Sequence, residues 1–168
     1  MDILKDIDLD CLEIAAGDRP TPGFIHNDLR PLEHIEIVCD CLKIDEFLAG
    51  HGVGDKRFTA IRATHILEHF PYSDTVKVLL KWQDLLLPSG SIHIEVPNFS
   101  WQTRAHSDGT ISDDKAVYYV YGEQNYDGNF HKAAFTEEII RVKLRDAGFI
   151  NITVSDIGQV LIANANKP

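Results

Sequence analysis

Four short apolar runs occupy the first 65 residues, and each one stops at small or polar residues. These residues are Ala15-Ala16-Gly17, Asp28, Asp40 and Thr64-His65. Continuous apolar runs of this length are typical of strands that are buried in a parallel sheet. Because the carboxyl ends of parallel strands meet at one edge, the sequence predicts a nucleotide-type cofactor crevice at that edge.

The remaining pattern predicts the rest of the fold. Seven segments are expected to be strands: residues 11–16, 24–27, 35–39, 58–64, 91–96, 149–155 and 159–165. Helices are expected over residues 43–49, from Ser73 to about Leu87, and from Thr136 to Gly148. Only three residues join the last two strands, which requires an antiparallel hairpin. We therefore expect an α/β fold, a three-layer Rossmann-like sandwich with a mostly parallel seven-stranded sheet and an antiparallel last strand.

Two connections do not follow the usual pattern. Residues 97–134 show no clear period, and we expect a long loop that covers the crevice. Residues 18–23 join the first two strands, although a parallel crossover normally takes a dozen or more residues and a helix. We therefore expect the first helix to be absent and one sheet face to be thinly covered. A second copy in a homodimer or the N-terminal residues would cover that face.

Composition limits the class of protein. A chain of 168 residues predicts a single domain over residues 1–168. The net charge of −10 disfavours a nucleic-acid partner, and no apolar run reaches the roughly 20 residues that span a bilayer. The N-terminal stretch is acidic and lacks the basic start of a signal peptide. The three cysteines fit no disulfide framework, so we expect reduced thiols in a cytoplasmic protein.

The strand ends also suggest individual roles. A carboxylate at Asp28 can accept hydrogen bonds from a ribose diol, and small residues at Ala15 and Gly17 let a ligand approach the backbone. Asp40 can accept from an adenine amino group, with Cys41 against the ring. Each of these residues taken alone also fits an ordinary turn.

Further motifs carry a family resemblance. The fourth strand is followed by Leu67-Glu68-His69-Phe70, and a later stretch reads Gly128-Asn129-Phe130-His131-Lys132. Together with Glu13-Ile14-Ala15-Ala16-Gly17, they resemble the class I S-adenosylmethionine-dependent methyltransferases, in the small type 11-like branch, over about residues 11–155.

The resemblance implies S-adenosylmethionine as the cofactor and a small molecule or a sugar or glycan as the methyl acceptor. The implied cofactor-binding residues are Glu13, Ala15, Ala16, Gly17, Asp28, Leu29, Asp40, Cys41, Thr64 and His65. Aromatic and polar residues of the later stretch would bind the acceptor: Tyr121, Gln124, Tyr126 and Phe130. Because histidine titrates near neutrality, a catalytic base is expected among His65, His69 and His131.

Two alternatives stay open. The first motif has Arg19 where the family has its third glycine, and the first helix is missing, which would fit a non-catalytic or degenerate cofactor-binding domain. The stretch from His65 to His69 also reads H-x-x-E-H, with Glu68 as the acid of a zinc hydrolase. Pro71 would cut such a metal-binding helix short, and no third ligand stands at a characteristic spacing, so no metal site is expected.

Overall fold

The computed structural model describes residues 9–126 and 128–168. The first eight residues, which were expected to lack a signal peptide and were one candidate cover for the sheet, lie outside the described residues. None of the described helices is long and apolar enough to cross a membrane.

Seven strands form one mixed sheet in the order β3-β2-β1-β4-β5-β7-β6. Strands β1 to β5 run parallel, and β7 is antiparallel to both β5 and β6. This order and the antiparallel last strand confirm the predicted Rossmann-like α/β fold. The strand bounds are β1 Cys11–Ile14, β2 Ile25–Asp28, β3 Ile37–Val38, β4 Phe58–Thr64, β5 Leu86–Pro97, β6 Ile150–Asp156 and β7 Val160–Asn166.

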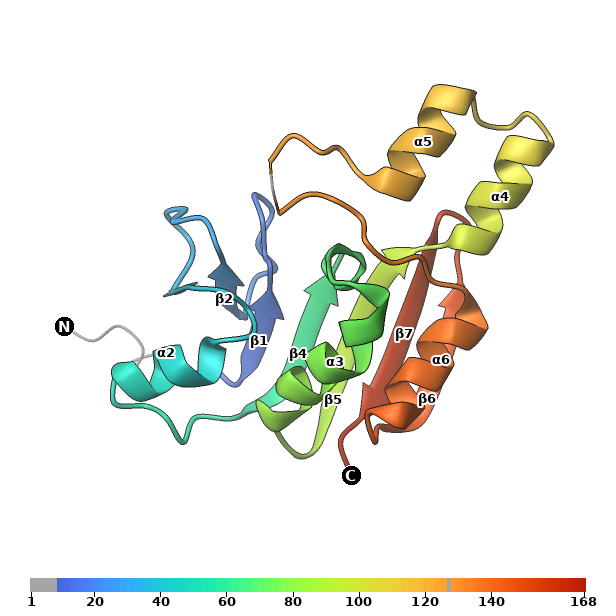
Figure 1. Ribbon diagram of the computed structural model, residues 1–168. Helices are drawn as coiled ribbons and strands as arrows, with labels where there is room; N and C mark the ends of the chain where they lie inside the picture. The colour runs from blue at the N-terminus through green and yellow to red at the C-terminus, as the bar shows by residue number, and fades with distance from the viewer. Residues whose placement is uncertain (1–8, 127) are drawn as a thin grey trace.

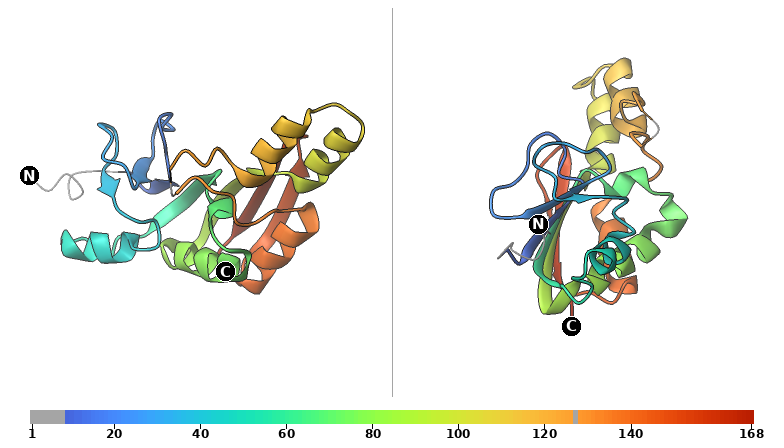
Figure 2. Two further views of the ribbon diagram at one scale, coloured as in Figure 1. Left: turned by 45° about the horizontal axis from the view of Figure 1, so that its top comes forward. Right: turned by 90° about the vertical axis from the view of Figure 1, so that its left-hand side faces the viewer.

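The helices divide into two groups (Figure 1). Helices α2, α3 and α6 lie along one face of the sheet, as the right-hand view of Figure 2 shows. Helices α4 and α5 stand beyond the carboxyl end of β5. The bounds are α2 Ile44–Gly50, α3 Thr75–Asp84, α4 Phe99–Ser107, α5 Asp113–Tyr121 and α6 Glu137–Asp146, with short 3-10 turns η1 Leu67–His69 and η2 Tyr72–Asp74.

The core lies between the sheet and helices α3 and α6. Alternate residues of β5 and β7 are buried on this face and stand opposite one another, as in the pairs Ile94 with Ala163 and Val96 with Leu161. Trp82 of α3 is fully buried in the same cluster. The period-2 burial of β5 is the one expected when a strand buries a single apolar face.

The helix expected from Ser73 to about Leu87 is shorter than predicted. Ser73 belongs to η2 and caps nothing, and α3 ends at Asp84. Leu86 instead begins β5, where it pairs with Phe58 and is buried. By contrast, the Thr136 cap is confirmed, because its side chain accepts a hydrogen bond from the Ile139 N–H at 3.3 Å.

The prediction of a structureless loop over residues 97–134 is wrong for its first part, which forms α4 and α5. Asn98 and Ser112 cap these helices through hydrogen bonds to backbone N–H groups three residues on. The apolar side chains of α5 are largely exposed, including Val117 and Tyr121. An exposed helix needs no apolar stripe, so the sequence carried no helical period there.

The predicted absence of a first helix is confirmed in residues 15–24, all of which the structure describes. The connection folds back onto β1 instead. Both carboxylate oxygens of Glu13 accept hydrogen bonds from Thr21, one from its N–H at 2.7 Å and one from its hydroxyl at 2.6 Å. The Nε of Arg62 lies 3.3 Å from the same carboxylate. Glu13 therefore anchors the short connection.

The sheet face opposite the core cluster is polar. In register across the strands, Glu13 stands between His26 and Arg62, and Arg62 stands beside His93. Arg62 donates to Glu95 at 2.7 Å, and a ring nitrogen of His93 lies 2.9 Å from the same oxygen. A row of paired charges does not need an apolar cover. The homodimer stays a prediction, but a second copy would have to complement this charged row.

We expect Glu13→Gln to destabilise the fold by about 1–3 kcal/mol, because the amide cannot accept on both sides from a buried position. Urea denaturation measures the change in the free energy of unfolding. The matched control is Glu33→Gln, which changes the same groups at an exposed position. Equal stability of the two variants would contradict the anchoring role.

Candidate active site

Two adjoining cavities lie at the carboxyl edge of the sheet. We call the first the strand-end cavity and the second the helical cavity, since residues of α4 and α5 line it. Each has a volume of about 370 Å³. Their linings share His65, His69 and Asn129, so the two cavities meet at these residues.

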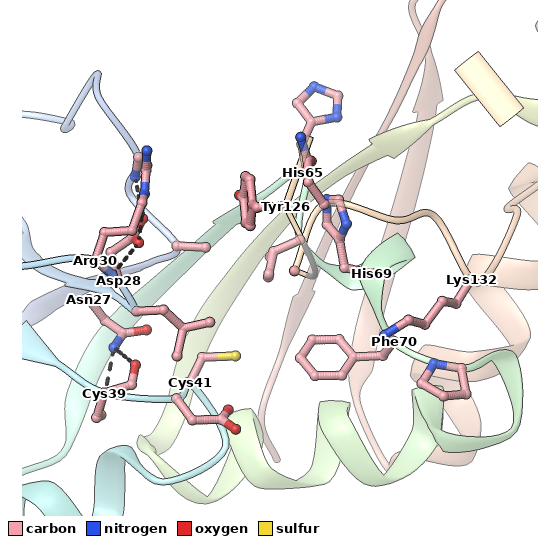
Figure 3. Close-up of a pocket in the computed structure, with 18 residues that line it drawn as sticks. Asn27, Asp28, Arg30, Cys39, Cys41, His65, His69, Phe70, Tyr126 and Lys132 are labelled. Carbon is pink, nitrogen blue, oxygen red and sulfur yellow. Dashed lines mark hydrogen bonds and ion pairs between the residues drawn. The ribbon is translucent and has the colours of Figure 1, made fainter. Parts of the chain in front are cut away.

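The strand-end cavity is built from the loops that follow β1 to β4. It lies at the point where the strand order reverses, between β1 and β4, which is where open α/β sheets bind ligands. Figure 3 shows Asn27, Asp28 and Cys39 on one side and His65, His69 and Phe70 on the other, with Tyr126 between them. The residues that line the strand-end cavity are Ala15, Gly17, Asn27, Asp28, Leu29, Arg30, Cys39, Asp40, Cys41, His65, Ile66, His69, Phe70, Pro71, Tyr126, Gly128, Asn129 and Lys132.

The Asp28 carboxylate is fixed in this cavity by several hydrogen bonds. Its carboxylate accepts from the Gly17 N–H at 3.0 Å and from the Arg30 N–H at 2.9 Å. The Arg30 side chain also donates to it, from Nε at 3.2 Å. Burial alone would raise the pKa of Asp28, but the hydrogen bonds from Arg30 and Gly17 outweigh it, so the pKa lies below its ordinary value of 3.8. The carboxylate is ionised at neutral pH.

Most predicted cofactor-binding residues lie in this lining: Ala15, Gly17, Asp28, Leu29, Asp40, Cys41 and His65. Three others lie outside it. Glu13 faces the polar side of the sheet, Ala16 donates its N–H to the Asn27 carbonyl at 2.9 Å, and Thr64 ends β4. Arg19 is exposed at the turn after β1.

The predicted acceptor-binding residues do not gather in one place. Tyr126 lines the strand-end cavity, whereas Tyr121, Gln124 and Phe130 lie outside both linings and are exposed. The three histidines predicted to include a catalytic base do line the cavities. His65 and His69 line both cavities, and His131 lines the helical cavity.

Several lining residues were missed from the sequence. In the strand-end cavity they include Asn27, whose amide donates to the carbonyls of Ile37 and Cys39 at 2.9 Å each. Its place directly before Asp28 was the available signal. Arg30 was also missed, although it follows Asp28 in the same turn and donates to it from its backbone N–H. In the helical cavity the missed residues are Pro97, Trp101, Gln102, Tyr118, Tyr119, Gly122, Glu123, Gln159 and Val160.

The cysteines of the cavity are free thiols. Burial, helped by nearby carboxylates, raises the pKa of Cys39 to about 11 and that of Cys41 to about 12. Both side chains are therefore uncharged at neutral pH and act as apolar wall rather than as nucleophiles.

The boundary between the cavities carries four ionisable side chains. Nδ1 of His65 lies 3.4 Å from the Glu68 carboxylate, without the alignment of a hydrogen bond. The pKa of His65 is raised because Glu68 favours the charged ring more than burial disfavours it. Burial lowers the pKa of His69, and the neighbouring His131 adds to the lowering against the opposing effect of Glu68.

The H-x-x-E-H stretch does not form a metal-binding α-helix. Only Leu67–His69 make a 3-10 turn, and His65 has a positive φ of 52° outside it. The helix that a zinc hydrolase of this type needs is thus absent from residues 65–71, which are all described, as the position of Pro71 led us to expect.

The low pKa of Asp28 predicts an acid-sensitive contribution to stability. A depressed folded pKa stabilises the fold above the unfolded pKa, and this contribution is lost as pH falls through the folded value. We expect urea titrations between about pH 6 and pH 3 to show a smaller stability loss for Asp28→Asn than for the wild type. Parallel pH profiles would contradict the ionised, hydrogen-bonded Asp28.

No protein-family model matches the chain, and no curated protein sequence matches it. Solved structures do. A SAM-dependent methyltransferase from Archaeoglobus fulgidus matches with a TM-score of 0.61 at 14% identity, over 94% of this chain and 85% of that one. A 1,6-didemethyltoxoflavin-N1-methyltransferase from Burkholderia thailandensis, with its substrate and S-adenosylhomocysteine bound, matches with a TM-score of 0.60 at 20% identity, over 94% and 70%.

Other similar structures are longer than this chain. An O-methyltransferase family protein from Burkholderia thailandensis matches with a TM-score of 0.54 at 14% identity. The match covers 99% of this chain but only 54% of that protein, so this chain spans about half of its length. Together the likenesses show that the chain has the fold of the class I S-adenosylmethionine-dependent methyltransferases.

Proposed function

We propose that this chain, with its class I methyltransferase fold, is an S-adenosylmethionine-dependent methyltransferase that acts on a small molecule or a sugar. One observation carries the proposal. A cavity at the switch point of the sheet, walled by the buried carboxylate of Asp28, meets a second cavity at His65 and His69. Two substrates held in adjoining cavities can react where the cavities meet.

The strand-end cavity has the chemistry to hold the cofactor. Asp28 would accept from the ribose diol, as the carboxylate at this strand end does in nucleotide-binding folds. Within the part of the chain that the structure describes, the side-chain oxygen of Asn27 is buried without a partner beside it. Asp40 and the uncharged Cys41 would contact the adenine, and a volume of about 370 Å³ falls in the range of small-molecule sites.

The bound cofactor supplies an activated methyl group, which leaves the protein three tasks: alignment, exclusion of water and removal of a proton. His65 and His69 lie at the boundary where the methyl group would cross. The segment after α5 brings Tyr126 and Asn129 over the strand-end cavity, where they would exclude water. A histidine at the boundary would take the proton of a hydroxyl or amine acceptor.

The helical cavity is the proposed place of the acceptor. Trp101, Tyr118 and Tyr119 offer flat apolar surfaces, while Gln102 and Glu123 offer hydrogen-bonding groups. This mixture suits a ring with several polar substituents, such as a sugar or a heterocycle. The Burkholderia thailandensis structure, which holds 1,6-didemethyltoxoflavin, supports a small molecule over a polymer. We keep the cytoplasm as the proposed location because Cys11, Cys39 and Cys41 are free thiols, which suits a reducing compartment.

Titration calorimetry with S-adenosylhomocysteine tests the proposal. We expect saturable binding at one site with micromolar affinity. Absence of binding at millimolar ligand, in protein shown to be folded by circular dichroism, would rule out the methyltransferase.

A second candidate function is a non-catalytic domain with weakened cofactor binding. The observation in its favour is the Arg30 side chain, which occupies the Asp28 carboxylate that the ribose would need. Arg30 is 42% exposed and is also held by Asp18 at 3.5 Å. If this second function holds, wild-type protein binds S-adenosylhomocysteine weakly and Arg30→Ala restores tight binding.

A further inference from the structure

Three potential metal ligands converge where the two cavities meet. Oxygen or nitrogen atoms of Glu68, His69 and His131 all lie within 4.8 Å of one another. His69 and Glu68 come from η1, whereas His131 returns from more than 60 residues later in the chain. The rings of His69 and His131 stand edge to face with centroids 5.1 Å apart. The cluster is therefore made by the tertiary fold and not by a local sequence motif.

Backbone contacts orient both rings toward this cluster. Nδ1 of His69 lies 3.2 Å from the Phe130 carbonyl, and Nδ1 of His131 lies 3.0 Å from the Tyr119 carbonyl. A carbonyl can only accept, so each Nδ1 carries the hydrogen and each Nε2 keeps its lone pair free. This tautomer is the one that protein carbonyls impose on metal-binding histidines.

The Glu68 side chain adds a buried carboxylate that lacks a hydrogen-bond partner. Its side chain is 1% exposed, and among residues 9–126 and 128–168 neither of its oxygens has a hydrogen-bond partner. The nearest cationic group is the misaligned Nδ1 of His65 at 3.4 Å. A buried carboxylate without hydrogen bonds strongly destabilises the fold unless a well-placed cation compensates its charge.

We propose that Glu68, His69 and His131 bind a divalent transition-metal ion such as Zn²⁺ or Fe²⁺. Two imidazoles and one carboxylate are a ligand set that these ions take, and they leave further coordination positions open. With metal–ligand bonds of about 2.1 Å, ligand atoms lie roughly 3.0–3.5 Å apart, so side-chain rotations of about 1 Å would close the cluster. The open positions face the helical cavity, whose lining includes all three residues.

The role of the ion rests on the proposed function. An acceptor hydroxyl that coordinates the ion would lose its proton to solvent more readily, because the ion stabilises the resulting anion. The oxygen lone pair then forms the bond to the methyl carbon, while the carbon–sulfur bond breaks and leaves its electron pair on sulfur. The acceptor class would accordingly be a hydroxyl compound that can reach the ion from the helical cavity.

The proposal differs from the H-x-x-E-H pattern in its ligands. That pattern would bind zinc through His65 and His69 and keep Glu68 as the catalytic acid. The folded cluster instead uses Glu68 and His131 as ligands together with His69, and His65 is not a ligand. His65→Ala and His131→Ala therefore separate the two arrangements directly. The matched control is His51→Ala, since His51 stacks on Phe47 at the end of α2 and belongs to neither arrangement.

The test is titration of the metal-free protein with Zn²⁺, and with Co²⁺ to follow visible absorption. We expect one equivalent bound by the wild type and by His51→Ala, and a loss of affinity of at least about 100-fold in His131→Ala and Glu68→Gln. His65→Ala should keep its affinity within about tenfold. Because His131 is partly exposed, its variant keeps the test valid even if Glu68→Gln fails to fold.

Three outcomes would overturn the metal site: no binding by the wild type, binding that survives His131→Ala, or binding lost in His65→Ala alone. Titration of the same samples with S-adenosylhomocysteine separates this proposal from the methyltransferase proposal. Cofactor binding without metal binding would refute the metal site alone. Metal binding without cofactor binding would refute the methyltransferase and leave the metal site in place.

Discussion

Asp28→Ala is expected to weaken the binding of S-adenosylhomocysteine by roughly 10- to 150-fold. The carboxylate would accept charge-assisted hydrogen bonds from the ribose, and each such bond to a charged group contributes about 1.5–3 kcal/mol. Asp28 is ionised and fixed in place by the Gly17 N–H, so the acceptor is pre-oriented for a ligand. Titration calorimetry on the wild type and the variant measures the ratio of the two dissociation constants.

Arg30→Ala is the control, because it changes the partner of the same carboxylate. It removes the guanidinium that competes for Asp28 but leaves the backbone hydrogen bond from the Arg30 position intact. We expect its affinity to equal or exceed that of the wild type. Wild-type affinity in Asp28→Ala would remove Asp28 from the cofactor site, and a loss in Arg30→Ala would show that the guanidinium itself binds the ligand.

Gly122→Ala is expected to loosen the packing of the segment after α5, which carries Tyr126, Asn129 and His131 into the cavity linings. Gly122 has φ 79° and ψ −178°, a conformation that essentially only glycine adopts. A Cβ there would lie 2.7 Å from the Asn129 carbonyl oxygen and 2.9 Å from the His131 ring. The strained backbone alone costs about 1–3 kcal/mol, which corresponds to roughly 5- to 150-fold faster hydrogen exchange at the His131 amide.

Gly109→Ala is the matched control for this prediction. Gly109 also has a positive φ, 77°, in the turn between α4 and α5, but a Cβ there would meet no described atom within 4 Å. We expect exchange at His131 to stay unchanged in this variant, and exchange at the core residue Ile94 to stay unchanged in both. Normal protection of His131 in Gly122→Ala would mean that the close approach at Gly122 is unimportant.

Most of the fold could be predicted from the sequence because its signals are local. The apolar runs of the strands, the Thr136 cap and the three-residue connection before β7 each follow from neighbouring residues. The end of α3 could not be placed, since Leu86 serves equally well as the end of an apolar helix stripe and as the start of a buried strand. Helix α5 was not predicted because its apolar side chains are exposed and form no buried stripe.

Topology predicted the candidate site at the strand ends, whereas His69, His131 and Tyr126 were predicted from the family resemblance. Asp28 and Asp40 follow apolar runs directly, so their position at the edge of a parallel sheet follows from topology. Glu13 also lies near a strand end, but the alternation of side chains turns it to the opposite face, where it anchors Thr21. The approach of His131 to Glu68 joins residues that are far apart in the sequence, so no local spacing encodes it.

A crystal structure of the protein with S-adenosylhomocysteine tests the central claim most directly, namely that the cofactor lies in the strand-end cavity and faces the helical cavity. We predict ribose hydroxyls within about 3 Å of the Asp28 carboxylate, with Arg30 displaced from it. The sulfur should lie at the boundary formed by His65 and His69. A ligand bound elsewhere, or a ribose out of reach of Asp28 while Arg30 keeps its place, would contradict the account.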